Sequence, residues 1–472
     1  MRTLTKFVPR AGFAKCAVKA IRVPFFHASL HENKNDFGEI APYPSAGSHN
    51  TQVAMSTRRN RPLITILNLA LLALLECCLS SGAATFDVRD YGAHGDGRTL
   101  DSVAIQKAIN ACAKAGGGSI RLGPGTYLSG PLFLRGNHTT LHLDAGAVLQ
   151  GTVEFTNYRD SKGKIAGLIN ATRLTDVSIT GAGVIDGAGA PWWPAIREAK
   201  KTGAPEPRQR PKMVNFKDCH GVTVRDVTLQ NAPSFHLMPV DCDDVLIDHV
   251  TIKAPADSPN TDAIDPSACR NVRILNCLLD VGDDNVAVKA GHAVPGRAFC
   301  CQDILVSNCV CLHGHGISIG SETSGGVSNF RVVRCTFSGT VSGIRIKTTR
   351  EKGGRVENIL YSDLAMKDVK RPIDIACYYP KVPKDDPARP VTSTTPAYNG
   401  IRIESLIGDS PEGAGLIVGL PESPIRGVTL LNVHLKAVTG LLVQNAEDVN
   451  LTDVKIQVEQ GESVIIKNAK VR

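Results

Sequence analysis

Short apolar runs that alternate with polar residues recur along the chain, and each is followed by a polar or cysteine position and a second apolar run. Examples are "GVTVRDVTLQ" at 221–230 and "NVRILNCLLD" at 271–280. Alternation with a period of two, with many Val and Ile residues, predicts β-strands rather than helices. The units begin at Asp176, Gly221, Asp244, Asn271, Asp303, Asn329, Asn358, Gly400, Gly427 and Asp448.

The units recur at intervals of 21 to 45 residues, which indicates a solenoid or a propeller. A leucine-rich repeat requires a Leu/Asn pattern that these units lack, and a propeller requires about four strands in roughly 40 residues. Short strands separated by tight turns fit a coil of about 25 residues better. We therefore predict an all-β fold, a right-handed parallel β-helix of about ten coils.

Segments outside the repeats predict a cap and two long loops. "SVAIQKAINACAKAGG" at 102–117 has a helical period, and we expect it to cover the N-terminal end of the solenoid. The two longest intervals between units predict loops near 187–213 and 380–398. The first loop holds Trp192 and Trp193, which we expect either to pack on the solenoid or to wall a binding cleft.

The N-terminal segment is expected to lie outside the folded domain. Residues 55–84 join a basic start, a 13-residue apolar run and a group of small residues, an order typical of a secretory signal peptide. The apolar run is short for a membrane span, which needs about 20 residues. Residues 1–54 are interpreted as an upstream extension from a mis-assigned start, with an organelle transit peptide as the alternative. We expect 85–472 to form the β-helix of a secreted or periplasmic protein.

Most of the positive charge belongs to this leader. Residues 1–84 hold ten Lys and Arg against four Asp and Glu, so the remaining chain carries +2 of the total of +8. This balance argues against a general, charge-driven affinity for nucleic acid or, once the signal peptide is removed, for membranes. Recognition of an acidic partner must therefore depend on local basic residues.

Eleven of the 14 cysteines follow residue 84, and most of them occupy repeated places in the coil. We expect inward ladders in which free Cys acts as a small hydrophobe, although neighbouring rungs lie close enough for an occasional disulfide. A zinc site is not expected, because these positions point into the core. The ladder residues are Cys277, Cys309 and Cys335, six residues after a unit start, and Cys219, Cys242, Cys269 and Cys301, two residues before one.

The stretch 258–291, "SPNTDAIDPSACRNVRILNCLLDVGDDNVAVKAG", places five aspartates among apolar strands. Alignment of the coils on the strand that follows each polar turn puts Asp262, Asp284, His315 and Ser342 at one position. Because successive coils of a solenoid stack, we expect these residues to lie in a row on one face.

Other ionisable residues join this row in the aligned coils. Asp283 lies one residue before its rung, and Lys289 and Lys347 each lie five residues beyond theirs. Arg345 points the same way as Lys347 because side chains alternate along a strand. A structural role in the turns is expected for two other acids of the stretch, Asp265 and Asp280.

Crowded carboxylates are suited to glycosidic hydrolysis. Like charges raise the pKa of one group, which then serves as the acid, while another stays ionised and activates water. Neighbouring Arg and Lys side chains suit a sugar that carries its own carboxylate. Two other classes remain open: a lyase that binds Ca²⁺ at the aspartate doublet, and a β-helix adhesin without catalysis.

Four short motifs resemble those of the polygalacturonases, family 28 of the glycoside hydrolases. They are the Asn-Thr-Asp, Asp-Asp, Gly-His-Gly and Arg-Ile-Lys signatures, found here at Asn260–Asp262, Asp283–Asp284, Gly314–Gly316 and Arg345–Lys347. They occur in the family's order, one per coil. The resemblance extends from about residue 84 to the C-terminus and implies a right-handed parallel β-helix.

The resemblance also implies an activity, the inverting hydrolysis of α-1,4-galacturonan without a metal or other cofactor. Asp283 then corresponds to the proton donor, Asp262 and Asp284 to the pair that positions water, and His315 to a residue that adjusts the donor. A substrate-binding tyrosine falls in "IDIACYYP" at 373–380, where Tyr379 is preferred to Tyr378. The expected substrate-binding residues are Asn260, Lys289, Arg345, Lys347 and Tyr379.

The expected partner is an acidic polysaccharide of the pectin type, bound by a monomer. The sequence leaves open whether the chain is cut internally or from its end. If the two long loops close one end of the cleft, the enzyme releases single units, and we favour this exo mode. Homogalacturonan is the expected substrate, with rhamnogalacturonan and xylogalacturonan as alternatives.

Overall fold

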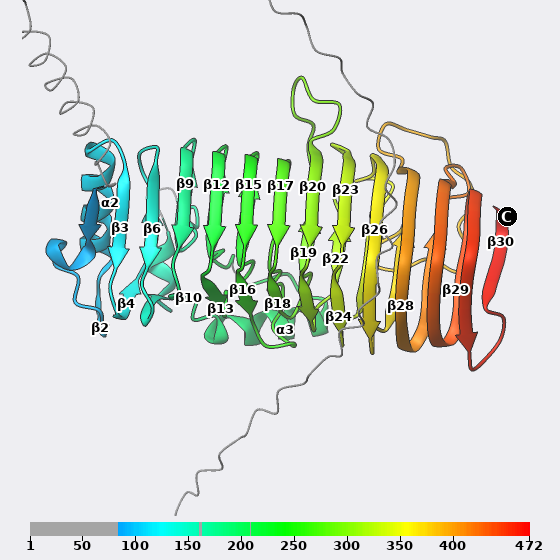
Figure 1. Ribbon diagram of the computed structural model, residues 1–472, viewed down its shortest axis with the longest axis horizontal. Helices are drawn as coiled ribbons and strands as arrows, with labels where there is room; N and C mark the ends of the chain where they lie inside the picture. Colours follow the sequence, from blue (N-terminus) through cyan, green and yellow to red (C-terminus); the bar gives the residue numbers. More distant parts are fainter. Residues whose placement is uncertain (1–83, 160–162, 208) are drawn as a thin grey trace, which may run out of the picture. The chain divides into compact units, whose positions relative to one another are not determined.

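The described part of the chain is a solenoid whose coils stack in parallel. In this computed structural model the described residues are 84–159, 163–207 and 209–472. The predicted extension 1–54 and most of the predicted signal peptide lie outside them. Strands from successive coils run side by side along the solenoid axis (Figure 1). This arrangement confirms the predicted parallel β-helix.

Two of the three faces of the solenoid carry a strand from almost every coil. Sheet 1 consists of β1 (Thr85–Asp87), β3 (Gly118–Leu122), β6 (Thr139–Leu143), β9 (Thr175–Thr180), β12 (His220–Arg225), β15 (Asp243–Asp248), β17 (Arg270–Leu275), β20 (Cys301–Ser307), β23 (Val327–Val333), β26 (Arg355–Lys367), β28 (Ala397–Val418), β29 (Ile425–Val458) and β30 (Val464–Val471). Sheet 2 consists of β2 (Asp96–Leu100), β4 (Gly125–Ser129), β7 (Ala147–Gly151), β10 (Val184–Asp186), β13 (Thr228–Gln230), β16 (Thr251–Lys253), β18 (Leu278–Asp280), β21 (Val310–Leu312) and β24 (Thr336–Ser338).

The third face carries the candidate site. Its two groups of strands are joined through Ile264, which bridges Leu237 on one side and Val286 on the other. Near the C-terminal end β26 and β28 pair with strands of more than one face, so the sheets merge there. Sheet 3 consists of β5 (Leu132–Phe133), β8 (Ile169–Thr172), β11 (Val214–Lys217), β14 (Leu237–Val240), β19 (Val286–Val288), β22 (Ile317–Ile319), β25 (Ser342–Lys347) and β27 (Arg371–Ala376).

The recurring unit starts are corner residues with left-handed backbone. All ten have a positive φ, from 52° at Asp176 to 69° at Gly221, and all ten are Asp, Asn or Gly. These are the residues that adopt this conformation at least cost. Side chains at this corner also bond from coil to coil, as where Asn329 Nδ2 donates to Asp303 Oδ1 at 2.8 Å. Asp, Asn or Gly therefore recurs at the start of each unit because the corner requires left-handed backbone.

The core is filled by inward side chains, among which cysteines form ladders as predicted. Cys277, Cys309 and Cys335 are buried, and so are Val227 and Val250 at the same place in earlier coils. All eleven cysteines of the described residues are free thiols, so the disulfides considered above do not form there.

A helix covers the N-terminal end, as predicted. Helix α2 (Ser102–Lys114) buries Ile105, Ile109 and Cys112 and packs against β1, β3 and β5. The short 3-10 helix η1 (Val88–Tyr91) also contacts α2.

The predicted loop at 187–213 is wrong in one respect, because it contains a helix. The 3-10 helix η3 (Ala190–Trp192) leads into α3 (Trp193–Thr202), which ends at Gly203 with φ 73°. The buried positions Trp193, Ile196 and Ala199 recur every three residues, a spacing that could have revealed the helix. Trp192 packs on the rings of η2 (Phe155–Tyr158). The tryptophans therefore anchor this segment to the solenoid.

The second long loop, 380–398, is irregular until β28 begins and is held by a charged network. Arg350 pairs with Asp386 of the loop at 2.6 Å and with Glu422 at 2.6 and 3.0 Å. Tyr378 donates its hydroxyl hydrogen to Asp386 Oδ2 at 2.7 Å. These contacts fix the loop beside the end of β27.

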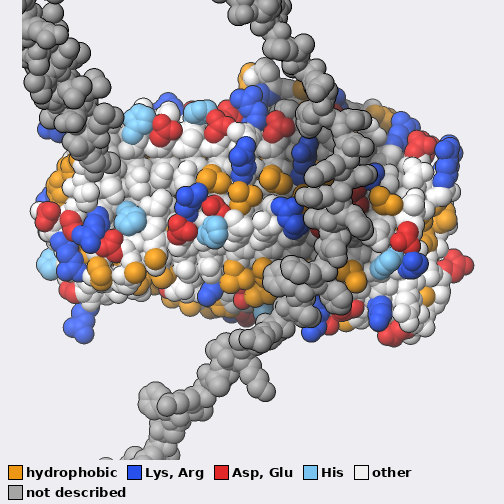
Figure 2. Space-filling model, viewed as in Figure 1, with side chains coloured by type: hydrophobic (Ala, Val, Ile, Leu, Met, Phe, Trp, Pro, Cys, Tyr) orange, Lys and Arg blue, Asp and Glu red, His pale blue; other side chains and the backbone are white. Residues whose placement is uncertain are grey.

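The charges on the drawn face and the length of the helices bear on nucleic-acid and membrane binding. Figure 2 shows positive and negative side chains intermixed along the drawn face of the solenoid, where grey atoms do not cover it. Within the described residues, no helix has both the length and the apolar character required to cross a bilayer.

We expect Asn271→Val to lower the free energy of unfolding by about 1–2 kcal/mol, because a β-branched side chain is strained in the left-handed backbone that asparagine tolerates. Asn271 has φ 52° at a sheet 1 corner, and valine also removes its hydrogen bond to Asp244. Asn271→Gly should remain closer to wild type. Thermal melts of the three proteins check this, and equal losses for the two variants would contradict it.

Candidate active site

The acidic residues lie in a row across sheet 3. The register pairs Ile264 with Val286, Val286 with Ile317 and Ile317 with Ile344. The residues two positions earlier in each coil therefore stack as well. This aligns the predicted row of Asp262, Asp284, His315 and Ser342, in which the two aspartates and the serine are buried.

The loop that carries Asp262 is shaped by its neighbours. Asn260 has φ 54°, a conformation that asparagine tolerates. Thr261 Oγ1 lies 2.6 Å from Ser258 Oγ and accepts the Gly282 amide of the next coil at 3.1 Å. A Cβ at Gly282 would lie 2.2 Å from Ser258 O. Glycine is therefore required before the doublet, where the two coils meet.

His315 is placed by a similar close approach. Gly316 has φ 80°, and a Cβ there would lie 2.1 Å from Ser342 O. Its amide donates to the buried Asn285 Oδ1 at 2.9 Å, while Asn285 Nδ2 donates to His313 O at 3.1 Å. The His315 amide donates to Asp283 O at 2.9 Å. These bonds lock the two coils together beneath the imidazole.

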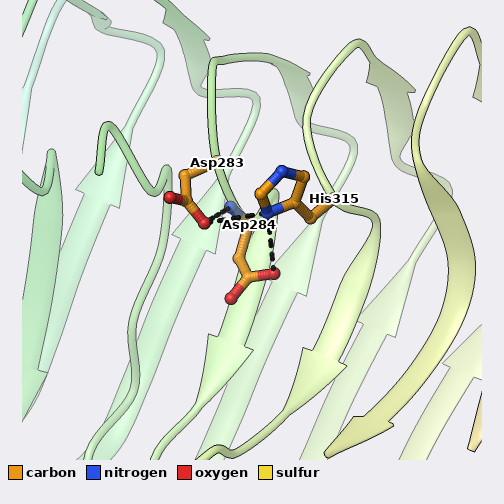
Figure 3. Close-up of side chains that lie close together, drawn as sticks. All are labelled: Asp283, Asp284 and His315. Atoms are coloured by element: carbon orange, nitrogen blue, oxygen red, sulfur yellow. Dashed lines mark hydrogen bonds and ion pairs between the residues drawn. The ribbon is translucent and has the colours of Figure 1, made fainter. Parts of the chain in front are cut away.

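Asp283 and His315 face each other at the surface of the row. His315 Nδ1 lies 3.0 Å from Asp283 Oδ1 and 3.9 Å from Asp284 Oδ1, and the three side chains converge (Figure 3). The Asp283 side chain is 17% exposed, against 2% for Asp284. Asp283 is therefore more open to an incoming ligand.

Asp284 is enclosed by donors. It accepts Lys347 Nζ at 2.7 Å, Arg345 Nη1 at 3.1 Å and Ser318 Oγ at 2.8 Å. Burial alone would raise the pKa of Asp284, but the charges of Lys347 and Arg345 outweigh it and hold that pKa well below its ordinary value. Asp284 therefore stays ionised.

Asp262 lies in a different environment, beside another carboxylate. Lys289 Nζ lies 3.5 Å from Asp262 Oδ2 and 3.4 Å from Asp265 Oδ2. Oδ1 of Asp262 and both side-chain oxygens of Asp265 are buried without a hydrogen bond within the described ranges. Two carboxyl groups thus share one ammonium group.

This sharing separates the protonation states of the acids. Burial, followed by the charge of Asp265, raises the pKa of Asp262 well above its ordinary value. Burial likewise raises the pKa of Asp265 to about 6, against the opposing charge of Lys289. Burial would also raise the pKa of Asp283, but the contact with His315 outweighs it and lowers that pKa. These shifts favour a proton on Asp262 over one on Asp283.

A small pocket continues the site toward the C-terminal end. Tyr379 is 42% exposed, and its ring lies 5.3 Å from Lys347 Nζ and 6.0 Å from Arg345 Cζ. Tyr378 also lines the pocket, but its hydroxyl bonds to Asp386, whereas the ring of Tyr379 lies beside both cations. The pocket is lined mainly by Arg345, Lys347, Arg371, Asp374, Tyr379 and Lys381.

The structure thus brings most of the predicted residues together, in three groups. His315 lies with Asp283, Arg345 and Lys347 lie with Asp284, and Lys289 lies with Asp262. Asn260 accepts a hydrogen bond from Arg210 Nη2 at 2.9 Å, and Arg210 belongs to the long insertion. Asp280 pairs with His313 at an outer turn, in keeping with the structural role expected for it.

Sequence reasoning missed several neighbours of the cluster. Asp265 was expected to be a turn residue, yet it is fully buried and paired with Lys289. Its place three residues after Asp262, on the same strand-like segment, was the available signal. Ser318, Arg210 and Asp374 lie in other coils, and no motif marks them.

One group in the site has the composition of a metal site. Ligand atoms of Asp283, Asp284 and His315 all lie within 4.8 Å of one another. However, both Asp284 oxygens already accept hydrogen bonds from cationic side chains. A divalent ion there would meet two positive charges at close range, so the donor set fits a metal poorly.

A row of buried carboxylates between cationic groups, on one sheet of a parallel β-helix, defines a carbohydrate-cleaving enzyme. The family model described as "Glycosyl hydrolases family 28" matches residues 112–440, which is more than half of the chain. The chain therefore belongs to family 28 of the glycosyl hydrolases, as its motifs predicted.

Named relatives agree with this assignment. The chain is 32% identical over 390 residues to a probable polygalacturonase of Vitis vinifera, covering 77% of each protein. It is 34% identical over 367 residues to an endo-polygalacturonase of Pectobacterium carotovorum subsp. carotovorum, covering 72% of this chain and 85% of that one. A family 28 exopolygalacturonase structure from Yersinia enterocolitica aligns with a TM-score of 0.68, covering 83% and 79% of the two chains. At 22% identity that likeness shows the fold alone.

We expect Asp265→Asn to stabilise the protein at pH 8 by on the order of 1 kcal/mol and to change little at pH 4. The folded pKa of about 6 lies above the ordinary 3.8, so the contribution of Asp265 to stability is present below pH 4. That contribution is lost as the pH rises through 6. Lys289 keeps Asp262 as a partner in the variant.

Melting temperatures of wild type and Asp265→Asn at both pH values measure this effect. Asp218→Asn, which removes an exposed carboxylate, is the matched control and should show no such dependence. A gain for Asp265→Asn that is the same at both pH values would contradict the assignment.

Proposed function

We propose that this protein hydrolyses galacturonosyl linkages in the pectin backbone, with Asp283 as the proton donor. The observation that carries the proposal is the contrast between Asp283 and Asp284. One is partly exposed beside His315, and the other is enclosed by Lys347 and Arg345. The polygalacturonases among its relatives support the substrate class. We further propose a secreted or periplasmic monomer.

In this mechanism the two remaining acids act on water. Asp284 stays ionised and orients a water molecule, and Asp262 accepts the proton that this water releases. Water that attacks the face opposite the leaving group inverts the anomeric centre. Lys289 holds Asp262 in position through its contacts with two carboxyl groups.

The donor must gain a proton when substrate binds. In the empty cleft the pKa of Asp283 is lowered and that of Asp262 is raised. A galacturonate carboxylate bound by Arg345 and Lys347 offsets the cationic charge that keeps neighbouring acids ionised, and so raises the pKa of Asp283. The single proton then moves from Asp262 to Asp283. The cluster titrates as one coupled unit in this scheme.

Substrate recognition falls to the cationic pair and the exposed tyrosine. Arg345 and Lys347 are 11% and 9% exposed, so their charges act in a partly dehydrated cleft. Tyr379 offers its ring to the apolar face of a sugar, next to both cations. Asn260, held by Arg210, borders the opposite side of the site. Arg345 and Lys347 therefore favour free uronates over methyl esters.

Two other activities predict different products. A Ca²⁺-dependent lyase would use the aspartate doublet as a metal site, yet Asp284 is already saturated by cations. It would also release unsaturated ends that absorb ultraviolet light. A non-catalytic adhesin does not account for a buried row of ionisable groups, which is costly to maintain without a function.

The two insertions support an exo mode. Helix α3 and the segment that follows it contact the coils just before Asp262, through Trp193 to Ala232 O and Arg197 to Asp257. The loop 380–398 borders the pocket on the other side. A cleft bounded at the α3 side accepts a chain end and not a chain interior.

We expect Asp283→Asn to lower kcat on polygalacturonate by at least about 100-fold, because general acid catalysis is lost. The loss should be much smaller on an aryl galacturonide, whose leaving group needs no proton. Asp262→Asn should lose activity equally on both substrates, since the base is needed for each. Reducing-end assays measure the first substrate, and the released phenol measures the second.

The opposite pattern, with Asp262→Asn rescued by the aryl substrate, would exchange the two roles. If chelator abolishes the activity of the wild type and Ca²⁺ restores it, the reaction is elimination and not hydrolysis. More than about a tenth of wild-type kcat in Asp283→Asn on polygalacturonate would remove Asp283 from the chemistry altogether.

We expect the wild-type enzyme to release galacturonic acid as its main product from the earliest times, with a slow fall in polymer viscosity. The physical reason is the position proposed above for α3, as a wall at one end of the cleft. Chromatography of timed digests and viscometry provide the two readings. Early oligomers of intermediate size with little monomer would establish an endo mode and leave the hydrolase assignment intact.

A further inference from the structure

A lysine outside the motifs stands at the edge of the same row. Lys212 lies at the end of the long insertion, just before β11, and its side chain is half-buried. Its ammonium contacts Met238 Sδ at 2.8 Å and lies 5.6 Å from the centre of the Phe235 ring. Within the described residues no carboxylate pairs with it.

The register connects this lysine to the catalytic row. Val214 pairs with Leu237, and Leu237 bridges to Ile264, so the residues two positions earlier also align. These are Lys212, Phe235 and Asp262. Neighbouring rungs lie about 4.8 Å apart, which places Lys212 about 10 Å from Asp262 along the solenoid. Arg345 and Lys347 lie on the other side of Asp262.

The charge balance of Lys212 differs from that of the other lysines in the cleft. Lys289 and Lys347 each contact a carboxylate. Burial lowers the pKa of Lys212, and the charge of Asp265 offsets this loss of water only in part. A half-buried ammonium whose one polar contact among the described residues is a thioether is costly. An anionic ligand would remove that cost.

Phe235 adds a surface for a sugar ring. Its half-buried ring lies between two ammonium groups, with Lys212 Nζ at 5.6 Å and Lys289 Nζ at 5.3 Å from the centroid. It also occupies the rung between Lys212 and Asp262. A pyranose over Asp262 and Phe235 would direct its carboxylate toward Lys212.

The surrounding backbone is held firmly. Arg210 donates to Pro259 O at 2.7 Å and to Pro233 O at 3.0 Å, which ties the insertion to two coils. The Lys212 carbonyl accepts the Leu168 amide at 3.0 Å. The chain around Lys212 is therefore fixed to the neighbouring coils.

We propose that Lys212 and Phe235 bind the uronate unit on the α3 side of the scissile bond, with the carboxylate on Lys212 and the ring over Phe235. This inference rests on the proposed function and deepens it. Each of the two units that flank the bond would then have its own carboxylate reader: Lys212 on one side, and Arg345 with Lys347 on the other. The cleft would thereby recognise free acid at both units.

Binding of digalacturonates in the inactive Asp283→Asn protein tests the proposal. The probes are digalacturonate, its two singly methyl-esterified isomers and the doubly esterified form, measured by calorimetry on the full chain. Lys212→Gln should weaken binding of the singly esterified isomer that keeps its free acid on the α3 side. The loss should be about tenfold or more, as expected for a charge-assisted hydrogen bond. The variant should leave the other isomer and the doubly esterified form within twofold.

Two further variants serve as controls. Arg345→Gln should give the opposite selectivity between the two isomers. Lys253→Gln removes an exposed lysine of β16 in sheet 2 and should change none of the affinities. Melting curves verify that Lys212→Gln is folded, and removal of an unpaired ammonium should not destabilise it.

The outcomes separate the two proposals. If Lys212→Gln binds all four probes within twofold of its parent, the subsite is excluded while the catalytic assignment stands. Equal losses on all four probes would assign Lys212 to the structure of the cleft and overturn the carboxylate role. If Asp283→Asn turns over substrate like wild type, the proposed function fails, whatever Lys212 does.

Discussion

The parallel stacking of coils is the constraint on which the rest of this structure depends. Backbone hydrogen bonds between rungs set a spacing of about 4.8 Å, and side chains at equivalent positions must therefore stack. A row of Lys212, Phe235, Asp262, Asp284 and His315 follows directly from that register. The distance between reacting groups is thus determined by the sheet, and the loops contribute the walls.

Within that row, neighbouring carboxylates differ because their partners differ. Asp284 has two cations and a hydroxyl, whereas Asp262 shares one ammonium with Asp265. The same side-chain chemistry therefore produces one acid that remains ionised and another that holds its proton. Asp265 contributes to this difference although it is fully buried, because its carboxyl group lies beside Asp262 and its charge raises the pKa of Asp262.

The sequence predicted what is periodic or contained within one segment. Corner residues with left-handed backbone repeat in every coil, and α2 has a clear helical period, so both could be found. Asp265 and Arg350 act through partners in other coils, and only the fold brings Arg350 to Asp386. Lys212 carries no motif, and its importance comes from the absence of a counter-ion in the described surroundings. Helix α3 was missed because a loop was expected wherever the repeat was interrupted.

The cysteine ladders have a consequence for how this solenoid comes apart. Burial and neighbouring thiols raise the pKa of residues such as Cys309 and Cys335, and a thiol attacks reagents only as its thiolate. These two buried thiols are therefore expected to react slowly with alkylating reagents while their coils are intact. The coils whose units begin between Gly221 and Asn358 each carry at least one cysteine, so opening any of these coils exposes a thiol. In a timed labelling experiment, the rate at which each cysteine reacts would report when its coil opens.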